Sequence, residues 1–173
     1  MSTPATAAVT AATFVALFAG HQVGDHIVQS AADAAAKGAP AAAAGLHPWT
    51  GWRACLSHVA TYALTQVLAL MVVAAATPFS WYGMAAAVVV SASTHAVIDR
   101  RWIVRTLVRA KRCEDWRDGP YLIDQSLHVG ILLPAAVLAA LTATPGALSA
   151  VAAGSVAIVG AGLAVERRLG VQR

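Results

Sequence analysis

Long runs of Ala, Val, Leu and Ile, separated by short polar segments, dominate this chain. Five of these runs are about 20 residues long, which is the length that an α-helix needs to cross the hydrocarbon core of a bilayer. They predict helices at about 5–30, 52–76, 81–99, 120–142 and 146–165. The pattern therefore predicts an all-α integral membrane bundle of about five transmembrane helices, forming a single domain over residues 1–173.

The composition agrees with this interpretation. Of the 173 residues, 58% are hydrophobic and only 12% are charged, and five spans would leave no room for a separate soluble module. We interpret the first apolar run as a retained helix and not as a cleavable signal peptide, because no Lys or Arg precedes it. Cys55 and Cys113 are too few for a disulfide framework, and we expect Cys55 to be a small packing residue.

The twelve Lys and Arg residues lie outside the apolar runs. They flank or occupy the first and third loops and the C-terminal tail, whereas the loops at 77–80 and 143–145 carry none. The positive-inside rule then places the N-terminus outside and the C-terminus in the cytoplasm. Aromatic residues are expected at both interfaces. These are Trp49, Trp52 and Trp102 on the inner side, and Trp81 and Tyr82 on the outer side.

Two further segments predict contacts with lipid or protein. Arginines alternate with apolar residues through Arg100–Arg112, which predicts that the third span continues as a basic amphipathic helix on anionic inner-leaflet lipid. The alternative is an ordinary positive-inside anchor, and no nucleic-acid partner is expected for so short a tethered cluster. Gly154, Gly160 and Gly162 in the fifth span predict close helix packing, including contact with a second copy in a homo-oligomer.

Ionisable residues near the ends of the apolar runs are the main indication of function. Three acids each lie four residues from a histidine, a spacing that puts both side chains on one helix face. Charged groups within membrane spans are costly and usually face the protein interior for a functional reason. The residues are His21 with Asp25, His95 with Asp99, Asp124 with His128, and His58 near the start of the second span. The predicted topology brings all seven towards the cytoplasmic side, in one layer.

Imidazole and carboxylate groups together form a ligand set for a divalent metal, most often zinc and also iron or manganese. We predict that these seven residues form a metal site, with Asp99 and Asp124 as candidate general bases. Seven groups exceed one tetrahedral site, so some would orient a ligand or hold a second metal. The alternatives are a hydrogen-bonded network that joins the helices and a proton or ion relay.

Neighbouring residues receive other roles. His26 points about 100° away from Asp25 and is excluded from the ligand set, while His47 lies in a loop and is expected to be solvated. Four polar side chains are expected to hydrogen-bond to the cluster. They are Gln29, Ser57, Thr94 and Gln125.

These segments resemble the domain of unknown function 3307, a family of small bacterial and phage membrane proteins. The likeness extends from about residue 15 to 133. It rests on His21-Gln-Val-Gly-Asp25-His-Ile-Val-Gln29, Ser57-His58, Thr94-His95-Ala-Val-Ile-Asp99 and Asp124-Gln125-Ser-Leu-His128. The resemblance implies a shared fold and polar cluster in a bacterial cytoplasmic (inner) membrane, without an established activity. The chain is also similar to membrane-bound metal-dependent hydrolases, which place His and Asp on helices.

We therefore expect an integral-membrane metal-dependent hydrolase that acts on a lipid-linked or membrane-associated substrate, with Arg100 and Arg101 near enough to hold a phosphate. A metal-ion or proton transporter or channel is the main alternative, although the outer halves of the spans are nearly all apolar. A non-enzymatic, phage-related membrane accessory protein is the third.

Overall fold

A computed structural model describes residues 3–38 and 51–171. It is built from helices, and the residues described contain no strand, which confirms the all-α prediction. The elements are α1 (Thr3–Val23), the π-helix η1 (Gly24–Val28), α2 (Ala31–Ala36), α3 (Trp52–Ala76), α4 (Trp81–Asp99), α5 (Trp102–Lys111), α6 (Gly119–Leu141) and α7 (Pro145–Val171). His47 and Trp49, which carried predictions, lie outside the residues described.

Five of these helices are long and apolar enough to cross a membrane, as the sequence predicted. They are α1 together with η1, then α3, α4, α6 and α7. The ends of α3 and α4 fall at the predicted residues, whereas α7 continues past the predicted end at residue 165. Pro145 opens α7, where its missing N–H costs nothing, and Thr144 Oγ1 accepts a hydrogen bond from the Ala147 N–H at 3.2 Å.

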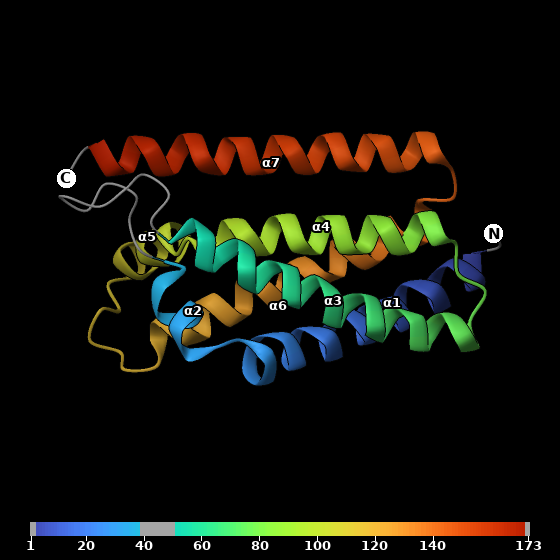
Figure 1. Cartoon of the computed structure of the whole chain (residues 1–173), viewed down its shortest axis with the longest axis horizontal. Coiled ribbons are helices and arrows are strands. Elements are labelled where there is room, and N and C mark those ends of the chain that lie inside the picture. Colours follow the sequence, from blue (N-terminus) through green and yellow to red (C-terminus); the bar gives the residue numbers. More distant parts are fainter. Residues whose placement is uncertain (1–2, 39–50, 172–173) are drawn as a thin grey trace.

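Four helices form a bundle and the fifth lies along its side (Figure 1). The core packs α1 against α3 and α6, and α4 against α3 and α6, while α7 packs on the outer face of α4. The axes of the long helices are roughly aligned, and the two ends of the chain lie at opposite ends of the molecule (Figure 1). This arrangement fits an odd number of crossings, while the orientation in the membrane stays a prediction.

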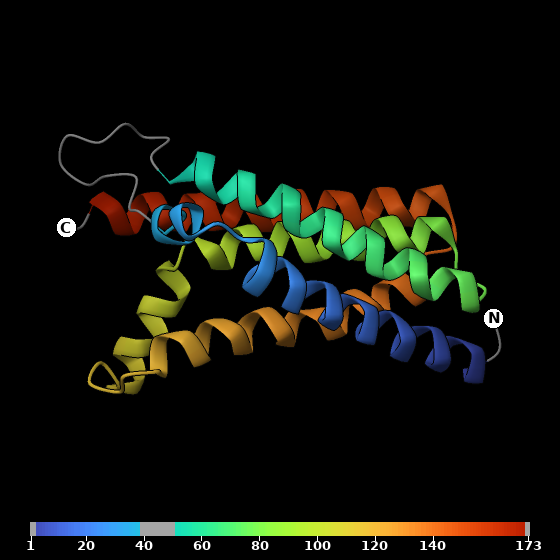
Figure 2. The same cartoon turned by 60° about the horizontal axis from the view of Figure 1, so that its bottom comes forward.

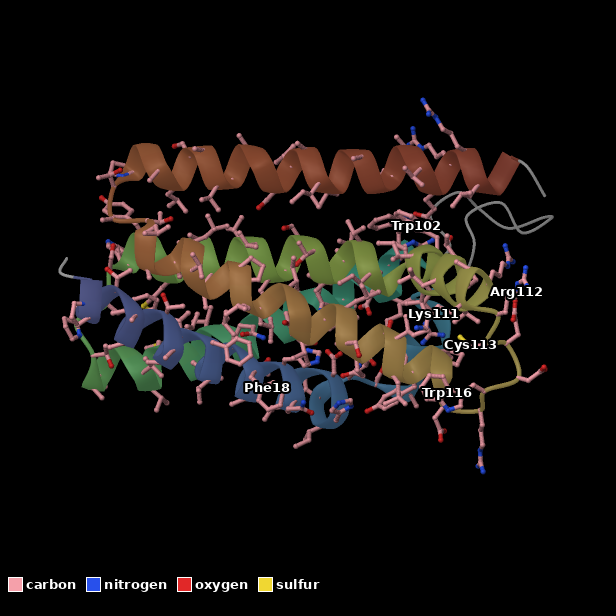
Figure 3. The ribbon with its side chains drawn as sticks, turned by 180° about the vertical axis from the view of Figure 1, so that it is seen from behind. Phe18, Trp102, Lys111, Arg112, Cys113 and Trp116 are labelled. Carbon is pink, nitrogen blue, oxygen red and sulfur yellow. The ribbon has the colours of Figure 1, made fainter. Side chains whose placement is uncertain are left out.

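Helix α5 lies across one end of the bundle, between the ends of α4 and α6 (Figure 2). A basic helix with one buried apolar side follows the third span, as predicted, but it is separate from α4 and does not continue it directly. The backbone breaks at Arg101, which has a left-handed φ of 58°. Beyond the break, α5 buries Val104 and Val108 against Ile98 of α4. Figure 3 shows Lys111, Arg112, Cys113 and Trp116 at this same end, which we call the basic end.

The segment that was predicted as the first loop begins with a short helix at the basic end. Ser30 caps α2 by accepting a hydrogen bond from the Asp33 N–H at 3.0 Å. We call residues 31–38 the strap, because arginines from α5 and from the junction between α4 and α5 bind its backbone carbonyls. The bonds run from Arg101 Nη2 to Ala34 O (3.0 Å), from Arg100 Nη1 to Lys37 O (2.6 Å) and from Arg105 Nη1 to Gly38 O (3.3 Å). The strap is thereby held against the end of the bundle.

The glycines of the fifth span behave differently from one another. Gly162 meets α4, since a Cβ there would lie 2.9 Å from Val97 Cγ1, which confirms close packing at that position. A Cβ added at Gly154 or Gly160 would meet no atom of another described segment within 4 Å. The prediction of close helix packing is therefore not met at these two positions within this chain. The predicted contact with a second copy would have to use that open face.

Gly83 allows α4 and α6 to approach closely, and its replacement tests this contact. A Cβ at Gly83 would overlap the carbonyl oxygen of Ala139, a backbone atom that cannot rotate away. We expect Gly83→Ala to destabilise the protein by about 1–3 kcal/mol, as overpacking usually does. Thermal unfolding in detergent measures this. Gly130→Ala is the control, because a Cβ added at Gly130 would meet no described atom within 4 Å. Equal melting temperatures for the two variants would contradict the close contact.

Candidate metal centre

Six of the seven predicted site residues converge between four helices. They come from α1 (His21), η1 (Asp25), α3 (His58), α4 (His95 and Asp99) and α6 (His128). All six side chains are almost completely buried, with Asp25 the most exposed at 4%. The structure therefore brings together groups that lie more than 100 residues apart in the sequence.

Four ligand atoms form the compact centre of this cluster. His58 Nε2 and His95 Nε2 are 3.0 Å apart. Asp25 Oδ1 lies 3.3 Å from the first nitrogen and 3.4 Å from the second. Asp99 Oδ2 lies 3.6 Å and 3.3 Å from the same two nitrogens. We call these four atoms the primary group.

The spacing of the primary group is that of ligands around a small metal ion. The two histidine nitrogens lie 3.0 Å apart, and each carboxylate oxygen lies 3.3–3.6 Å from both of them. Zinc binds histidine nitrogen at about 2.0–2.1 Å and carboxylate oxygen at about 2.0–2.2 Å. The two nitrogens with either carboxylate oxygen therefore have the spacing of three ligands to an ion of that size.

The charges and hydrogen bonds of the centre also favour a cation. Asp25 Oδ1 and Asp99 Oδ2 are buried and make no hydrogen bond of good geometry to any of the residues described. Two carboxylates face the centre, and among the residues that the structure describes one ammonium approaches them, that of Lys37. With neutral imidazoles, this leaves one negative charge in excess. An uncompensated charge at this depth is costly, and a bound cation would remove that cost.

A local irregularity of the first span positions Asp25. The helix widens into the π-turn η1 directly after α1, and such single turns are frequent at functional sites. Gly24 lets this turn lie close to α3, since a Cβ there would be 2.9 Å from Thr65 Oγ1. Asp25 thereby reaches His58 on α3. The apolar pattern of the sequence gives no sign of the π-turn.

Asp124 differs from the other predicted ligands. It is 20% exposed and lies behind His128, with its backbone oxygen 2.9 Å and its Oδ2 3.5 Å from His128 Nδ1. It belongs to neither of the two compact groups of candidate ligands in the part of the chain described, which are His21–Asp25–His95 and His58–His95–Asp99. This position suits a residue that orients a histidine better than one that binds the ion itself.

Sequence reasoning missed Lys37 as a residue of the site. Lys37 is 5% exposed, and its Nζ lies 2.7 Å from Asp99 Oδ1.

Arg100 lies beside the site as expected, but it has another role. It is 1% exposed, with Nε and Nη2 donating to Glu166 Oε1 at 2.9 and 2.7 Å and the guanidinium over Trp52. Arg100 is thus engaged within the protein, and the expectation that it would hold a phosphate was wrong. Trp52 is buried below the guanidinium, and its place at the inner membrane interface stays a prediction.

Polar side chains continue from the centre along α3. The ring of Tyr62 stacks on His95 at 3.8 Å between centroids, and its hydroxyl pairs with Ser91 Oγ at 2.8 Å. One turn further, buried Gln66 donates from Nε2 to Leu17 O at 3.0 Å. Buried polar side chains therefore extend further along the helices than we expected from the sequence, in which the outer halves of the spans are mostly apolar. Tyr62 and Gln66 follow His58 at four-residue spacing, a signal that the sequence contained.

Some of the residues near the cluster have the predicted role and others do not. His26 is exposed and Cys55 is a buried packing residue whose Sγ meets Ala96 O at 3.6 Å, both as predicted. Gln125 hydrogen-bonds to His21, again as predicted. Ser57 and Thr94 instead bond away from the cluster, Ser57 to Asp33 and Thr94 to carbonyls of its own helix. The amide nitrogen of Gln29 has no hydrogen-bond partner among the described residues.

Five apolar helices, four of which enclose a buried histidine and aspartate centre, define a multi-pass membrane protein with a candidate metal site. The family model described as Protein of unknown function (DUF3307) matches residues 13–154, and the chain belongs to this family. All six converging residues fall within the matched range. A search of curated proteins and a search of solved structures found no match.

Proposed function

We propose that this protein is an integral-membrane metal-dependent hydrolase, with zinc as the resident ion. The observation that supports this is the primary group, in which two imidazole nitrogens lie at ligand spacing from each of two carboxylate oxygens. His58 and His95 would hold the ion with Asp25 or Asp99. With three protein ligands, a position would stay open for water, and the ion would lower the pKa of that water and polarise a carbonyl or phosphoryl oxygen.

The surroundings of the centre support a lipid-linked or membrane-associated substrate. The site lies inside a bundle of apolar helices, and the strap at the basic end brings Lys37 to its edge. An ammonium beside a ligand carboxylate is placed to attract an anionic head group or developing negative charge. We assign Asp124 the role of orienting His128. Asp99 would be a ligand whose other oxygen contacts Lys37.

Elemental analysis of the purified protein tests the premise. We expect zinc to co-purify with the wild type, and His95→Ala to lower the affinity for zinc by at least about 100-fold, since an outer-shell change alone costs 10–100-fold. Activity is then measured as metal-dependent release of a soluble head group from lipids of the host membrane. His26→Ala, which changes an exposed histidine, is the control. A metal-free wild type that keeps its fold and its activity would contradict the proposal.

A transporter of metal ions or protons is the second candidate, and the polar side chains along α3 favour it. Tyr62, Gln66 and Ser91 extend the polar layer from the centre towards the middle of the bundle. Further along, most buried side chains are apolar and include Leu17, Leu70 and Leu132, each fully covered, although Thr13 is buried there too. An apolar layer of this kind closes a path unless it moves. Flux into liposomes that disappears with Asp25→Asn, without hydrolysis, would favour transport.

We also propose where the molecule sits and what it contacts. The exposed cations Arg109, Lys111 and Arg112 on and after α5 are suited to anionic lipid of the cytoplasmic leaflet, in a bacterial inner membrane. The open face of α7 around Gly154 and Gly160 is suited to a second copy. Binding of the purified protein to vesicles with and without anionic lipid, and cross-linking in the membrane, test these two contacts.

A further inference from the structure

Two buried histidines take no part in the primary group. His21 and His128 are each at most 1% exposed, and their rings stack with centroids 5.6 Å apart. One ring nitrogen of each, His21 Nδ1 and His128 Nε2, has no hydrogen-bond partner among the residues described. Each of these nitrogens faces a carboxylate oxygen that the primary group does not use, Asp25 Oδ2 for His21 and Asp99 Oδ1 for His128.

His128 has its tautomer set by the backbone of α6. Its Nδ1 lies 2.9 Å from Asp124 O, and because a carbonyl only accepts, this nitrogen carries the proton. In the neutral ring, Nε2 then presents a lone pair. It lies 3.6 Å from Asp99 Oδ1, which is too far for a hydrogen bond.

His21 is oriented in the same way by the next residue of α6. Gln125 Nε2 donates to Asp124 Oδ2 at 3.4 Å, which turns the amide oxygen of Gln125 towards His21. That oxygen lies 3.1 Å from His21 Nε2, so Nε2 donates and Nδ1 keeps a lone pair. His21 Nδ1 lies 3.7 Å from Asp25 Oδ2. As with His128 and Asp99, both atoms are acceptors, and neither carries a proton to share.

We propose that these four atoms form a second divalent-cation site beside the primary group, so that the centre is dinuclear. His21 Nδ1, Asp25 Oδ2, Asp99 Oδ1 and His128 Nε2 are its ligands. Each carboxylate then gives one oxygen to each ion, as a bridging ligand does. The proposal rests on the proposed function, because it assumes that an ion occupies the primary group.

Lys37 already places a positive charge beside one of these oxygens, Asp99 Oδ1. Its Nζ lies 2.7 Å from Asp99 Oδ1. A carboxylate offers about four lone-pair positions, so Asp99 Oδ1 can accept Lys37 on one side and an ion on the other. With two divalent ions and Lys37, positive charge exceeds the charge of the ligand carboxylates. The centre therefore suits an anionic group such as a phosphate ester, the chemistry typical of two-metal sites.

Manganese loading of the full-length protein in detergent tests the second site. After chelation and reloading with Mn²⁺, we expect two ions per chain and an electron paramagnetic resonance spectrum of exchange-coupled ions. His21→Ala with His128→Ala should reduce this to one ion with an uncoupled spectrum, and His26→Ala should leave two coupled ions. The wild-type spectrum keeps the test valid even if the double variant does not fold.

Each outcome has a distinct meaning. One uncoupled ion in the wild type overturns the second site and leaves the proposed function standing, whereas no ion overturns both. Two ions that persist in a folded His21→Ala/His128→Ala variant also overturn the assignment. Two coupled ions in the wild type, with inorganic phosphate changing the spectrum, support the dinuclear centre and its preference for phosphoryl groups.

Discussion

Asp99→Asn is expected to abolish metal binding and to destabilise the protein at the same time. Asp99 contributes Oδ2 to the primary group, and its Oδ1 holds the Lys37 ammonium at 2.7 Å. An amide donates where a carboxylate accepts, so affinity for zinc should fall by more than about 100-fold, beyond the effect of an outer-shell change. Lys37 is left buried without its partner, a loss of about 3–5 kcal/mol when a buried pair is broken.

A double variant separates the two effects. Asp99→Asn combined with Lys37→Met removes the buried ammonium as well, so stability measured in the presence of a chelator should largely recover while metal binding stays absent. The chelator matters because a bound ion would itself raise the apparent stability. If the double variant is as unstable as Asp99→Asn alone, Lys37 is not the partner that the geometry indicates.

Arg100→Met is expected to have the largest effect on stability without removing a ligand. The guanidinium joins three parts of the structure, because it binds Glu166 of α7 and Lys37 O of the strap and lies 4.8 Å above the ring of Trp52. Its loss removes the Arg100 partner of Glu166, whose side chain is 10% exposed. We expect about 3–5 kcal/mol of destabilisation, measured by thermal unfolding in detergent.

Three controls define the role of Arg100. Arg109→Met changes an exposed arginine of α5 and should shift stability by no more than about 0.5 kcal/mol. Arg100→Lys should not restore the wild-type stability, since an ammonium lacks the planar fork that binds Glu166 and Lys37 together. Adding Glu166→Leu to Arg100→Met should recover part of the loss. If Arg100→Met resembles Arg109→Met, the buried ion pair contributes little.

The helices were predictable because their cause is local. About 20 apolar residues in succession leave an α-helix as the only structure that satisfies every backbone group within lipid. This is why α3 and α4 begin and end at the predicted residues. The strap was missed because its short helix depends on the Ser30 cap and on arginines about 65 residues away in the sequence. The π-turn that contains Asp25 has no periodic signal either.

The candidate site was predictable in its members and not in its arrangement. Four-residue spacing of histidine and aspartate identified five of the six converging residues on three helices, and the depth of His58 added the sixth. Spacing along one helix says nothing about which oxygen faces which nitrogen. The position of Asp124 behind His128, and of Gln125 beside His21, follows from the rotation of α6 against α1 and α4.

By itself, the sequence determined that this chain is a five-helix membrane protein of its family with ionisable histidine and aspartate side chains within the spans, because hydropathy and residue spacing act along the chain. Only the tertiary structure decided that two imidazole nitrogens lie at ligand spacing from each of two carboxylate oxygens, and that Lys37 and Arg100 are buried beside them. Those facts depend on how four helices rotate and approach one another, and glycine contacts and ion pairs between distant residues set that packing.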